Sequence, residues 1–271
     1  MPKSLKLLAF DTSTDRLSIA VTDGARVWQH GGPGGAQASA TLIPAIMALL
    51  AESGMALGDL DAIAFGRGPG SFTGLRTACA VAQGLAFGAN HGAGIPVLPI
   101  DTLMAVAEEA RFQRHGALAE SDAPLSVLAL LDARMDEMYV QGYEFRSGLC
   151  TSIKGCELIR PENLVIGDTP QLLAGNVFGV YAGRLPADLA ARDCIEAYPT
   201  ATALLRLAPA LAAAGHCIEA AQALPLYVRD KVAQTTDERA RIKAAALAAS
   251  LVPAVSANPA VSPVPTIPLQ N

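Results

Sequence analysis

The feature that most constrains the fold of this chain is a glycine-rich segment between an apolar run and a helix-forming run. The apolar run covers residues 62–65, and small residues dominate the helix-forming run at residues 73–89. The glycines between them are Gly66, Gly68, Gly70 and Gly74. Glycine lets a backbone turn tightly and lets another group approach closely, because no Cβ blocks the way. The order therefore predicts a strand, a tight turn and a helix.

This turn has two possible uses. The unpaired N–H groups of a first helical turn favour an anion, and Arg67 or Arg76 could support one. The spacing matches neither the phosphate-loop pattern, which needs Gly-Lys-Ser/Thr, nor the dinucleotide fingerprint with its downstream acid. The alternative is a structural turn, in which Ser71 caps the helix.

A second polar turn follows the first predicted strand. Asp11 comes directly after the apolar residues 5–10 and precedes Thr12, Ser13 and Thr14. These side chains could hold a metal-bound phosphate. Short polar side chains also bond to nearby backbone groups, which would close a hairpin without any ligand.

The remaining pattern indicates an α/β fold with a mixed sheet in each half of the chain. A turn at residues 132–137 separates two strands, a helix starts near Pro161, and an extended segment at 224–229 returns to the first half. The predicted strands cover residues 5–10, 17–21, 25–30, 62–65, 97–99, 125–131, 138–145 and 171–175. The predicted helices cover residues 40–52, 73–89, 102–114 and 200–214.

Composition excludes several classes of protein. The chain has 271 residues, 51% of them hydrophobic, and a net charge of −5, which argues against strong independent nucleic-acid binding. Five cysteines without a Cys-x-x-Cys pair predict neither a disulfide framework nor a zinc site, and fit a reducing cytoplasm. Four scattered histidines show no ligand spacing, so we expect no bound catalytic metal. No apolar run approaches the roughly 20 residues of a membrane span, and the N-terminal run is too short for a signal peptide.

The helix at residues 73–89 has two smooth sides. One side carries small residues at intervals of four, namely Gly74, Ala78, Ala82 and Ala86. The other carries Ala80, Gly84 and Gly88. Glycine in a helix costs about 1 kcal/mol relative to alanine, so close packing is expected, against the sheet, another subunit or both.

The C-terminus changes character. Thr235 and Glu238 have capping-box spacing, and an alanine-rich helix is predicted to follow as far as about residue 251. Prolines punctuate the last 20 or so residues, which predicts a flexible, polyproline-like tail.

Two segments closely resemble the TsaB family, whose members are also called YeaZ-like. They are residues 8–14 and 66–76, with supporting matches at 82–86, 132–139 and 225–229. The resemblance implies an actin/Hsp70-like (ASKHA, RNase H-like) fold with two related lobes of mixed sheets flanked by helices. The expected N-terminal lobe covers residues 1–103 plus about 215–235, the second lobe covers 104–214, and the helix and tail cover 236–271.

The resemblance also implies a function. It is that of a non-catalytic scaffold and dimerisation subunit, which binds and activates the TsaD transferase. The complex forms N6-threonylcarbamoyladenosine at adenosine 37 of tRNAs that read ANN codons. The ATPase TsaE joins the pair, and ATP and metal belong to the partners, so this chain needs no cofactor. It would be cytoplasmic, form a homodimer when alone, and touch tRNA only indirectly or weakly. The rival interpretation is a nucleotide-binding enzyme that uses Asp11 and the segment 66–76.

The expected site residues fall into two sets, neither of them catalytic or metal-binding. A vestigial anion or nucleotide site would use Asp11, Thr12, Gly68, Gly70, Ser71 and Thr73. By carry-over from the family, a partner interface on the first two helices would use Leu42, Ile46, Leu49, Arg76, Ala78, Ala82 and Ala86. The chain departs from the family at residues 36–39. Family members often carry a basic residue, an acidic residue, a histidine and a serine or threonine there, and this chain keeps only the hydroxyl residue, Ser39. The glycines at residues 31–35 beside it predict a mobile loop.

Overall fold

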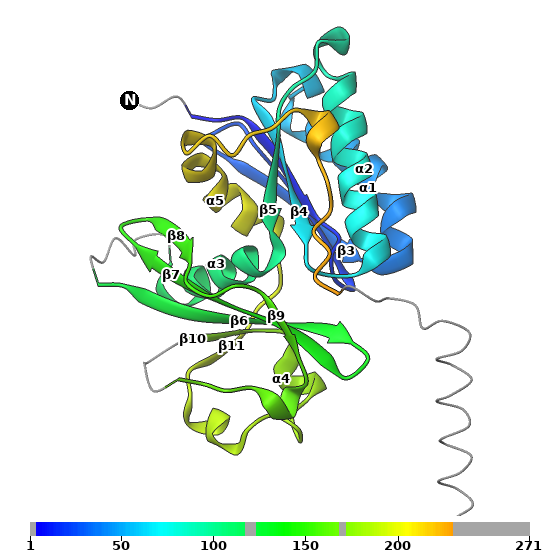
Figure 1. The fold of residues 1–271 in the computed structure, drawn as a ribbon. Helices are drawn as coiled ribbons and strands as arrows, with labels where there is room; N and C mark the ends of the chain where they lie inside the picture. The colour runs from blue at the N-terminus through cyan, green and yellow to red at the C-terminus, as the bar shows by residue number, and fades with distance from the viewer. Residues whose placement is uncertain (1–3, 117–122, 168–171, 230–271) are drawn as a thin grey trace, which may run out of the picture. The chain divides into compact units, whose positions relative to one another are not determined.

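Five strands form the first sheet, in the order β3-β2-β1-β4-β5. They are β1 (Leu7–Asp11), β2 (Arg16–Thr22), β3 (Val27–Pro33), β4 (Ala62–Gly68) and β5 (Val97–Asp101). The computed structural model describes residues 4–116, 123–167 and 172–229. Within the sheet, β1, β2 and β3 are antiparallel, whereas β1, β4 and β5 are parallel (Figure 1). Parallel neighbours need a crossover connection, and a helix follows both β3 and β4.

The second sheet repeats this topology. Its main path runs in the order β11-β10-β6-β7-β8, and a short strand β9 (Glu157–Ile159) also pairs with β7. The antiparallel part contains β6 (Leu125–Arg134), β7 (Glu137–Arg146) and β8 (Leu149–Ser152). The parallel part adds β10 (Leu172–Gly175) and β11 (Cys194–Glu196) beside β6. Each sheet is therefore built around one strand, β1 in the first sheet and β6 in the second. Two strands of an antiparallel meander lie on one side of it, and two parallel strands lie on the other.

Helices separate and cover the sheets (Figure 1). On one face of the first sheet lie α1 (Ala38–Ser53) and α2 (Phe72–Gly88), and α5 (Ala201–Ala213) packs on the other. Next to α5, α3 (Thr102–His115) packs on the second sheet. The remaining face of that sheet carries α4 (Val177–Val180). None of the helices in the described ranges combines the length and the apolar character needed to cross a membrane.

The central strands are buried on both faces. In β1, Leu8 and Phe10 pack with α1 and α2, whereas Leu7 and Ala9 pack with α5. Successive side chains of a strand point to opposite faces, so a strand covered on both sides reads as a continuous apolar run. This burial explains why residues 5–10 and 62–65 gave clear strand signals.

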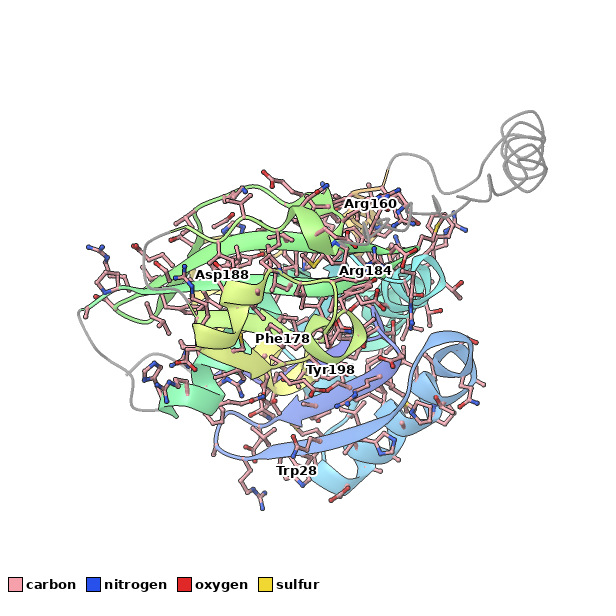
Figure 2. The ribbon with its side chains drawn as sticks, turned by 90° about the horizontal axis from the view of Figure 1, so that it is seen from below. Trp28, Arg160, Phe178, Arg184, Asp188 and Tyr198 are labelled. Carbon is pink, nitrogen blue, oxygen red and sulfur yellow. The ribbon has the colours of Figure 1, made fainter. Side chains whose placement is uncertain are left out.

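Contacts near the start of α5 join it to the first sheet. Ser18 Oγ accepts a hydrogen bond of 2.8 Å from the N–H of Ala201, and the Arg16 guanidinium lies 3.6 Å from the Tyr198 ring centroid. Figure 2 shows Tyr198 near the strands of the first sheet, and Trp28 on its edge strand β3. The helix α5 lies within the range expected for the second lobe, residues 104–214, and its apolar side chains pack on the first sheet. The lobe boundaries remain a prediction.

The structure confirms the main predicted strands and helices, with three differences. The expected loop at 31–35 is wrong in part, because Gly31, Gly32 and Pro33 pair with β2 as the end of the edge strand β3. The helix expected at Pro161 is a single 3-10 turn, Pro161–Asn163. The segment at 224–229 does return to the first sheet, where Leu226 N–H donates to Arg67 O at 2.7 Å, but it forms no strand.

Four short elements have three or four residues each and were not predicted, namely β8, β9, β11 and α4. So few residues carry no readable period. The capping box at residues 235–238, the alanine-rich helix and the proline-rich tail lie outside the described residues.

Candidate functional site: the glycine segment and the outer face of α1 and α2

The glycine segment packs directly on the polar turn that follows β1. Since β1 and β4 are parallel neighbours, the turn after Asp11 and the segment after β4 meet at one edge of the sheet. Each residue of the turn then faces a glycine: Asp11 faces Gly66, Ser13 faces Gly70 and Thr12 faces Gly74. The three glycines are therefore needed for close approach of two backbone segments.

An added methyl group would not fit at any of the three. A Cβ on Gly66 would overlap the Asp11 carboxylate, and one on Gly74 would overlap the Thr12 carbonyl oxygen. A Cβ on Gly70 would lie 2.6 Å from both Ser13 Cβ and Ser13 O. Such distances are much shorter than van der Waals contact. The spacing of the three glycines is therefore explained by packing within the chain.

Hydrogen bonds hold the two segments together. The N–H of Ser71 donates to Ser13 O at 2.7 Å, and Thr12 Oγ1 donates to Gly74 O at 2.7 Å. Ser71 also caps α2, because its Oγ accepts from the N–H of Gly74 at 3.4 Å. The Ser71 N–H that could have faced an anion thus bonds to a carbonyl of the chain itself.

Asp11 is fully buried at the centre of this arrangement. Its Oδ1 accepts hydrogen bonds from Ser13 N–H at 2.8 Å and from Ser13 Oγ at 2.6 Å. Its Oδ2 has no hydrogen-bond partner among the described residues and lies against Gly66. Burial raises the pKa of Asp11 to about 6, and the two bonds from Ser13 oppose that rise. A phosphate or a metal ion could reach this carboxylate only by displacing the glycine segment.

The six residues expected to form a vestigial anion site do not all come together. Asp11, Thr12, Gly70 and Ser71 belong to the contact just described. Gly68 has a φ of +124° and faces the segment after residue 223, since a Cβ there would lie 2.5 Å from Leu226 O. Thr73 is exposed on α2.

Six of the seven residues expected at a partner interface are buried inside this chain. They form part of the core between the two helices and the first sheet, and they are Leu42, Ile46, Leu49, Ala78, Ala82 and Ala86. These side chains have almost no surface to offer a partner. Arg76 alone of the seven is exposed. The physical reason is that α2 turns the row that contains Ala78 toward the sheet, which points the row with Arg76 outward.

The outward row of α2 is the smooth surface that sequence analysis left unassigned. It carries Arg76, Ala80, Gly84 and Gly88, all exposed. An added Cβ at Gly84 or Gly88 would meet nothing within 4 Å, so neither glycine is required by packing within the chain. The sequence signal that distinguishes the rows is the apolar pair Leu75 and Cys79, which shares a face with the buried row and leaves the other row outward.

Large apolar side chains are exposed on both α1 and α2. Ile43 and Met47 on α1 are 45% and 51% exposed, and Phe87 on α2 is 55% exposed. We define the α1–α2 outer face as the exposed small and apolar residues of both helices: Ala40, Ile43, Pro44, Met47, Ala48, Ala51, Ala80, Gly84, Phe87 and Gly88. The two helices contact each other and pack on the same face of the first sheet. Contiguous exposed apolar surface of this kind marks interaction sites.

One end of the outer face is held by an aromatic cluster. The Arg76 guanidinium stacks 3.8 Å from the Phe72 ring centroid, and its Nε donates to Tyr227 Oη at 3.1 Å. The Phe72 and Tyr227 rings lie 4.9 Å apart. Together with the Leu226 bond to Arg67, this cluster attaches the last described segment to the start of α2.

The acidic turn between β6 and β7 is occupied by contacts within the chain. Asp132 accepts a hydrogen bond of 2.7 Å from Tyr181 Oη, and Asp136 forms an ion pair with Arg184, which Figure 2 labels. Within the described part of the chain, no group of three or more His, Cys, Asp or Glu side chains could hold a metal ion.

Comparisons with known proteins agree on one family. The family model described as TsaD, tRNA N6-adenosine threonylcarbamoyltransferase, matches residues 35–258. The tRNA threonylcarbamoyladenosine biosynthesis protein TsaB of Haemophilus influenzae is 34% identical over 240 residues, which cover 85% of this chain and 96% of that protein. TsaB of Escherichia coli is 32% identical over 237 residues, which cover 84% and 96%. The structure of YeaZ from Pseudomonas aeruginosa superposes with a TM-score of 0.70 at 37% identity, covering 83% of this chain and 100% of that one.

Proposed function

Because the chain belongs to the TsaB (YeaZ) family of tRNA threonylcarbamoyladenosine biosynthesis proteins, we propose that it is a non-catalytic scaffold subunit. It has the family's α/β ASKHA fold, with two related lobes of mixed sheets flanked by helices. In the proposal, it binds and activates a TsaD-like transferase that modifies adenosine 37 of tRNAs reading ANN codons. The binding surface is the α1–α2 outer face.

The observation that carries this proposal is the pair of exposed glycines on α2. Gly84 and Gly88 have open space where a Cβ would sit. Glycine inside a helix costs about 1 kcal/mol relative to alanine, so Gly84 weakens the isolated chain, whereas Gly88 is the last residue of α2. A partner helix that crosses here could approach the α2 backbone closely, with Ile43, Met47 and Phe87 supplying apolar contact area.

The non-catalytic part of the proposal is supported by the contact between the glycine segment and the Asp11 turn. In a nucleotide-binding enzyme of this fold class, the turn after the first strand must be open to phosphate. Here Gly66, Gly70 and Gly74 fill the space above that turn. The match to a transferase family model is compatible with this proposal, since one fold supports different functions.

The α1–α2 outer face would also bind a second copy of this chain, and the remaining proposed partners would bind elsewhere. A TsaD-like chain of related fold would take one side of the α1–α2 outer face, and a second copy of this chain would take it when no TsaD-like chain is present. A TsaE-like ATPase would join the heterodimer and, with the TsaD-like chain, bring ATP and metal. Contact of this chain with tRNA would be indirect or weak, consistent with its net charge of −5. The tRNA substrate puts the complex in the cytoplasm.

Co-expression with a TsaD-like partner followed by size-exclusion chromatography tests the binding surface. We expect a stable heterodimer with the wild-type chain and none with Gly84→Leu, because the added side chain would stand between the two backbones. Ala213→Leu is the matched control, since Ala213 is exposed at the end of α5, away from the outer face. Co-elution of Gly84→Leu with the partner at wild-type yield would overturn the proposed surface.

The rival function is a nucleotide-binding enzyme that uses Asp11 and the segment 66–76. Isothermal titration of the full chain with ATP and magnesium separates the two. The scaffold proposal predicts no saturable binding. Tight binding with ATP turnover that disappears in Asp11→Ala would establish the enzyme instead.

A further inference from the structure

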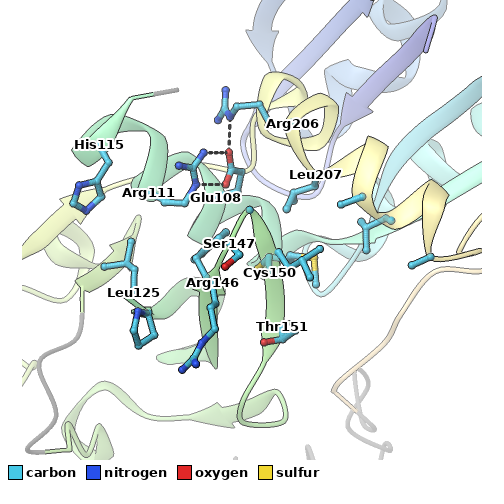
Figure 3. Close-up of a pocket in the computed structure, with 18 of the residues that line it drawn as sticks. Glu108, Arg111, His115, Leu125, Arg146, Ser147, Cys150, Thr151, Arg206 and Leu207 are labelled. Atoms are coloured by element: carbon cyan, nitrogen blue, oxygen red, sulfur yellow. Dashed lines mark hydrogen bonds and ion pairs between the residues drawn. The ribbon is translucent and has the colours of Figure 1, made fainter. Parts of the chain in front are cut away.

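A cavity of about 720 Å³ lies in the second half of the molecule, between α3, α5 and the turn that joins β7 to β8 (Figure 3). Its residues belong to neither the Asp11 turn nor the α1–α2 outer face. The volume falls within the roughly 300–1,000 Å³ that is usual for sites that hold small organic molecules.

The ionisable side chains that line the cavity are mostly basic. The lining contains Arg111, Arg146 and Arg206 but a single acid, Glu108, so it has a formal charge of +2 with its two histidines counted as neutral. This excess is unusual in a chain whose net charge is −5. Arg146 also pairs with Glu144, and Arg206 also pairs with Glu109. Neither of these two acids lines the cavity.

Glu108 fixes two of these arginines in place. It accepts from Arg111 Nε at 2.6 Å, from Arg111 Nη2 at 2.8 Å and from Arg206 Nε at 2.7 Å, as Figure 3 shows. Glu108 is nearly fully buried, so both guanidinium groups are preorganised. Arg111 and Arg206 thus present two fixed positive charges at one wall of the cavity.

Arg146 differs from the other two arginines. It lies at the end of β7 and its side chain is 60% exposed, with Glu144 3.3 Å away. An exposed ion pair of this kind contributes little free energy, so the guanidinium can turn to an incoming anion. Figure 3 shows its side chain pointing away from the Glu108 cluster.

Apolar side chains make up much of the rest of the lining. Met104 on α3, Leu207 and Leu211 on α5, and Phe145 and Leu149 around the β7–β8 turn contribute to it. A ligand that matches these walls needs an apolar body, and the arginines require a negative head group. We propose that this cavity binds a small amphipathic organic anion, such as a carboxylate with an apolar chain. The site is independent of partner binding.

The test uses the purified full chain and two probes. The fluorescent anion 1-anilinonaphthalene-8-sulfonate reports binding, and decanoate competes with it, with decanol as the neutral counterpart. Ala210→Trp adds a large side chain at a lining position of α5 and should lower probe affinity about tenfold or more. The matched control, Ala213→Trp, lies on the same helix outside the lining and should bind as wild type.

Arg146→Gln tests the charge. Its side chain is exposed, so the variant should fold normally and bind the probe about three- to tenfold more weakly. This variant keeps the test decisive if Ala210→Trp does not fold. The proposal is overturned if the probe shows no saturable binding, if folded Ala210→Trp or Arg146→Gln binds as tightly as wild type, or if decanol competes as well as decanoate.

Discussion

Gly74 and Gly84 lie in one helix, yet their surroundings give them opposite roles. Gly74 touches the Thr12 carbonyl, whereas Gly84 faces open space. The first glycine is required by packing within the chain. The second weakens the isolated helix and has a use only where something outside the chain approaches it.

Alanine substitution at the two positions should therefore change stability in opposite directions. Gly74→Ala is expected to lower the free energy of unfolding by about 3 kcal/mol, because the new Cβ overlaps backbone. Gly84→Ala is expected to raise it by about 1 kcal/mol through helix propensity. Urea unfolding of both variants, followed by circular dichroism, measures the two changes. Shifts of the same sign would contradict the assigned packing.

Asp11 makes the stability of the fold depend on pH. Its pKa is about 6 in the folded chain and 3.8 ordinarily, so the folded state binds the proton more tightly. The stabilisation is complete below pH 3.8 and is lost as the pH rises through about 6.

Asp11→Asn removes this titration and serves as the reference. Between about pH 3.5 and 7.5, we expect the unfolding free energy of the wild type to fall by roughly 3 kcal/mol relative to Asp11→Asn. Denaturant unfolding of both proteins at several pH values measures the difference. A difference that does not vary with pH would show that Asp11 is not buried as described.

The sequence predicts two rows of small residues on α2 but does not determine which row faces the first sheet. The reason is that the rotation of a helix about its axis is set by tertiary packing. The row with Ala78 and Ala82, which family resemblance predicted as part of the interface, is buried in the core of this chain.

At the scale of elements, α3 and α5 are joined by a buried ion cluster. Glu108 on α3 accepts hydrogen bonds from Arg111 on the same helix and from Arg206 on α5. Arg206 Nη2 also donates to Glu109 at 2.7 Å. Because α5 packs on the first sheet and α3 packs on the second, this ion cluster connects the helix layers of the two sheets.

Removing the central carboxylate should destabilise the pair of helices strongly. Glu108→Ala leaves two half-buried guanidinium groups without their acceptor, so the free energy of unfolding should fall by about 3–5 kcal/mol. Glu157→Ala is the control, since the exposed pair of Glu157 with Lys154 should contribute less than about 1 kcal/mol. Equal losses in the two variants, measured by chemical denaturation, would contradict the importance of burial.

At the scale of the whole molecule, the sequence predicted the α/β class, the long strands and the helices. Uninterrupted apolar runs between turns, such as residues 62–65, clearly indicate a strand, because a strand covered on both faces is apolar throughout. The repetition of one sheet topology in both halves was expected from family resemblance alone. Pairing between distant strands, such as β10 with β6, leaves no local signal in the sequence.

In the proposed complex, α2 presents Gly84 to a partner chain. Calorimetry gives the dissociation constant of the complex between Gly84→Ala and a TsaD-like partner. We expect this variant to bind about tenfold more weakly than wild type although it is more stable alone. Binding at wild-type strength would contradict the proposal, since an interface that needs close backbone approach cannot accept the added methyl group without loss.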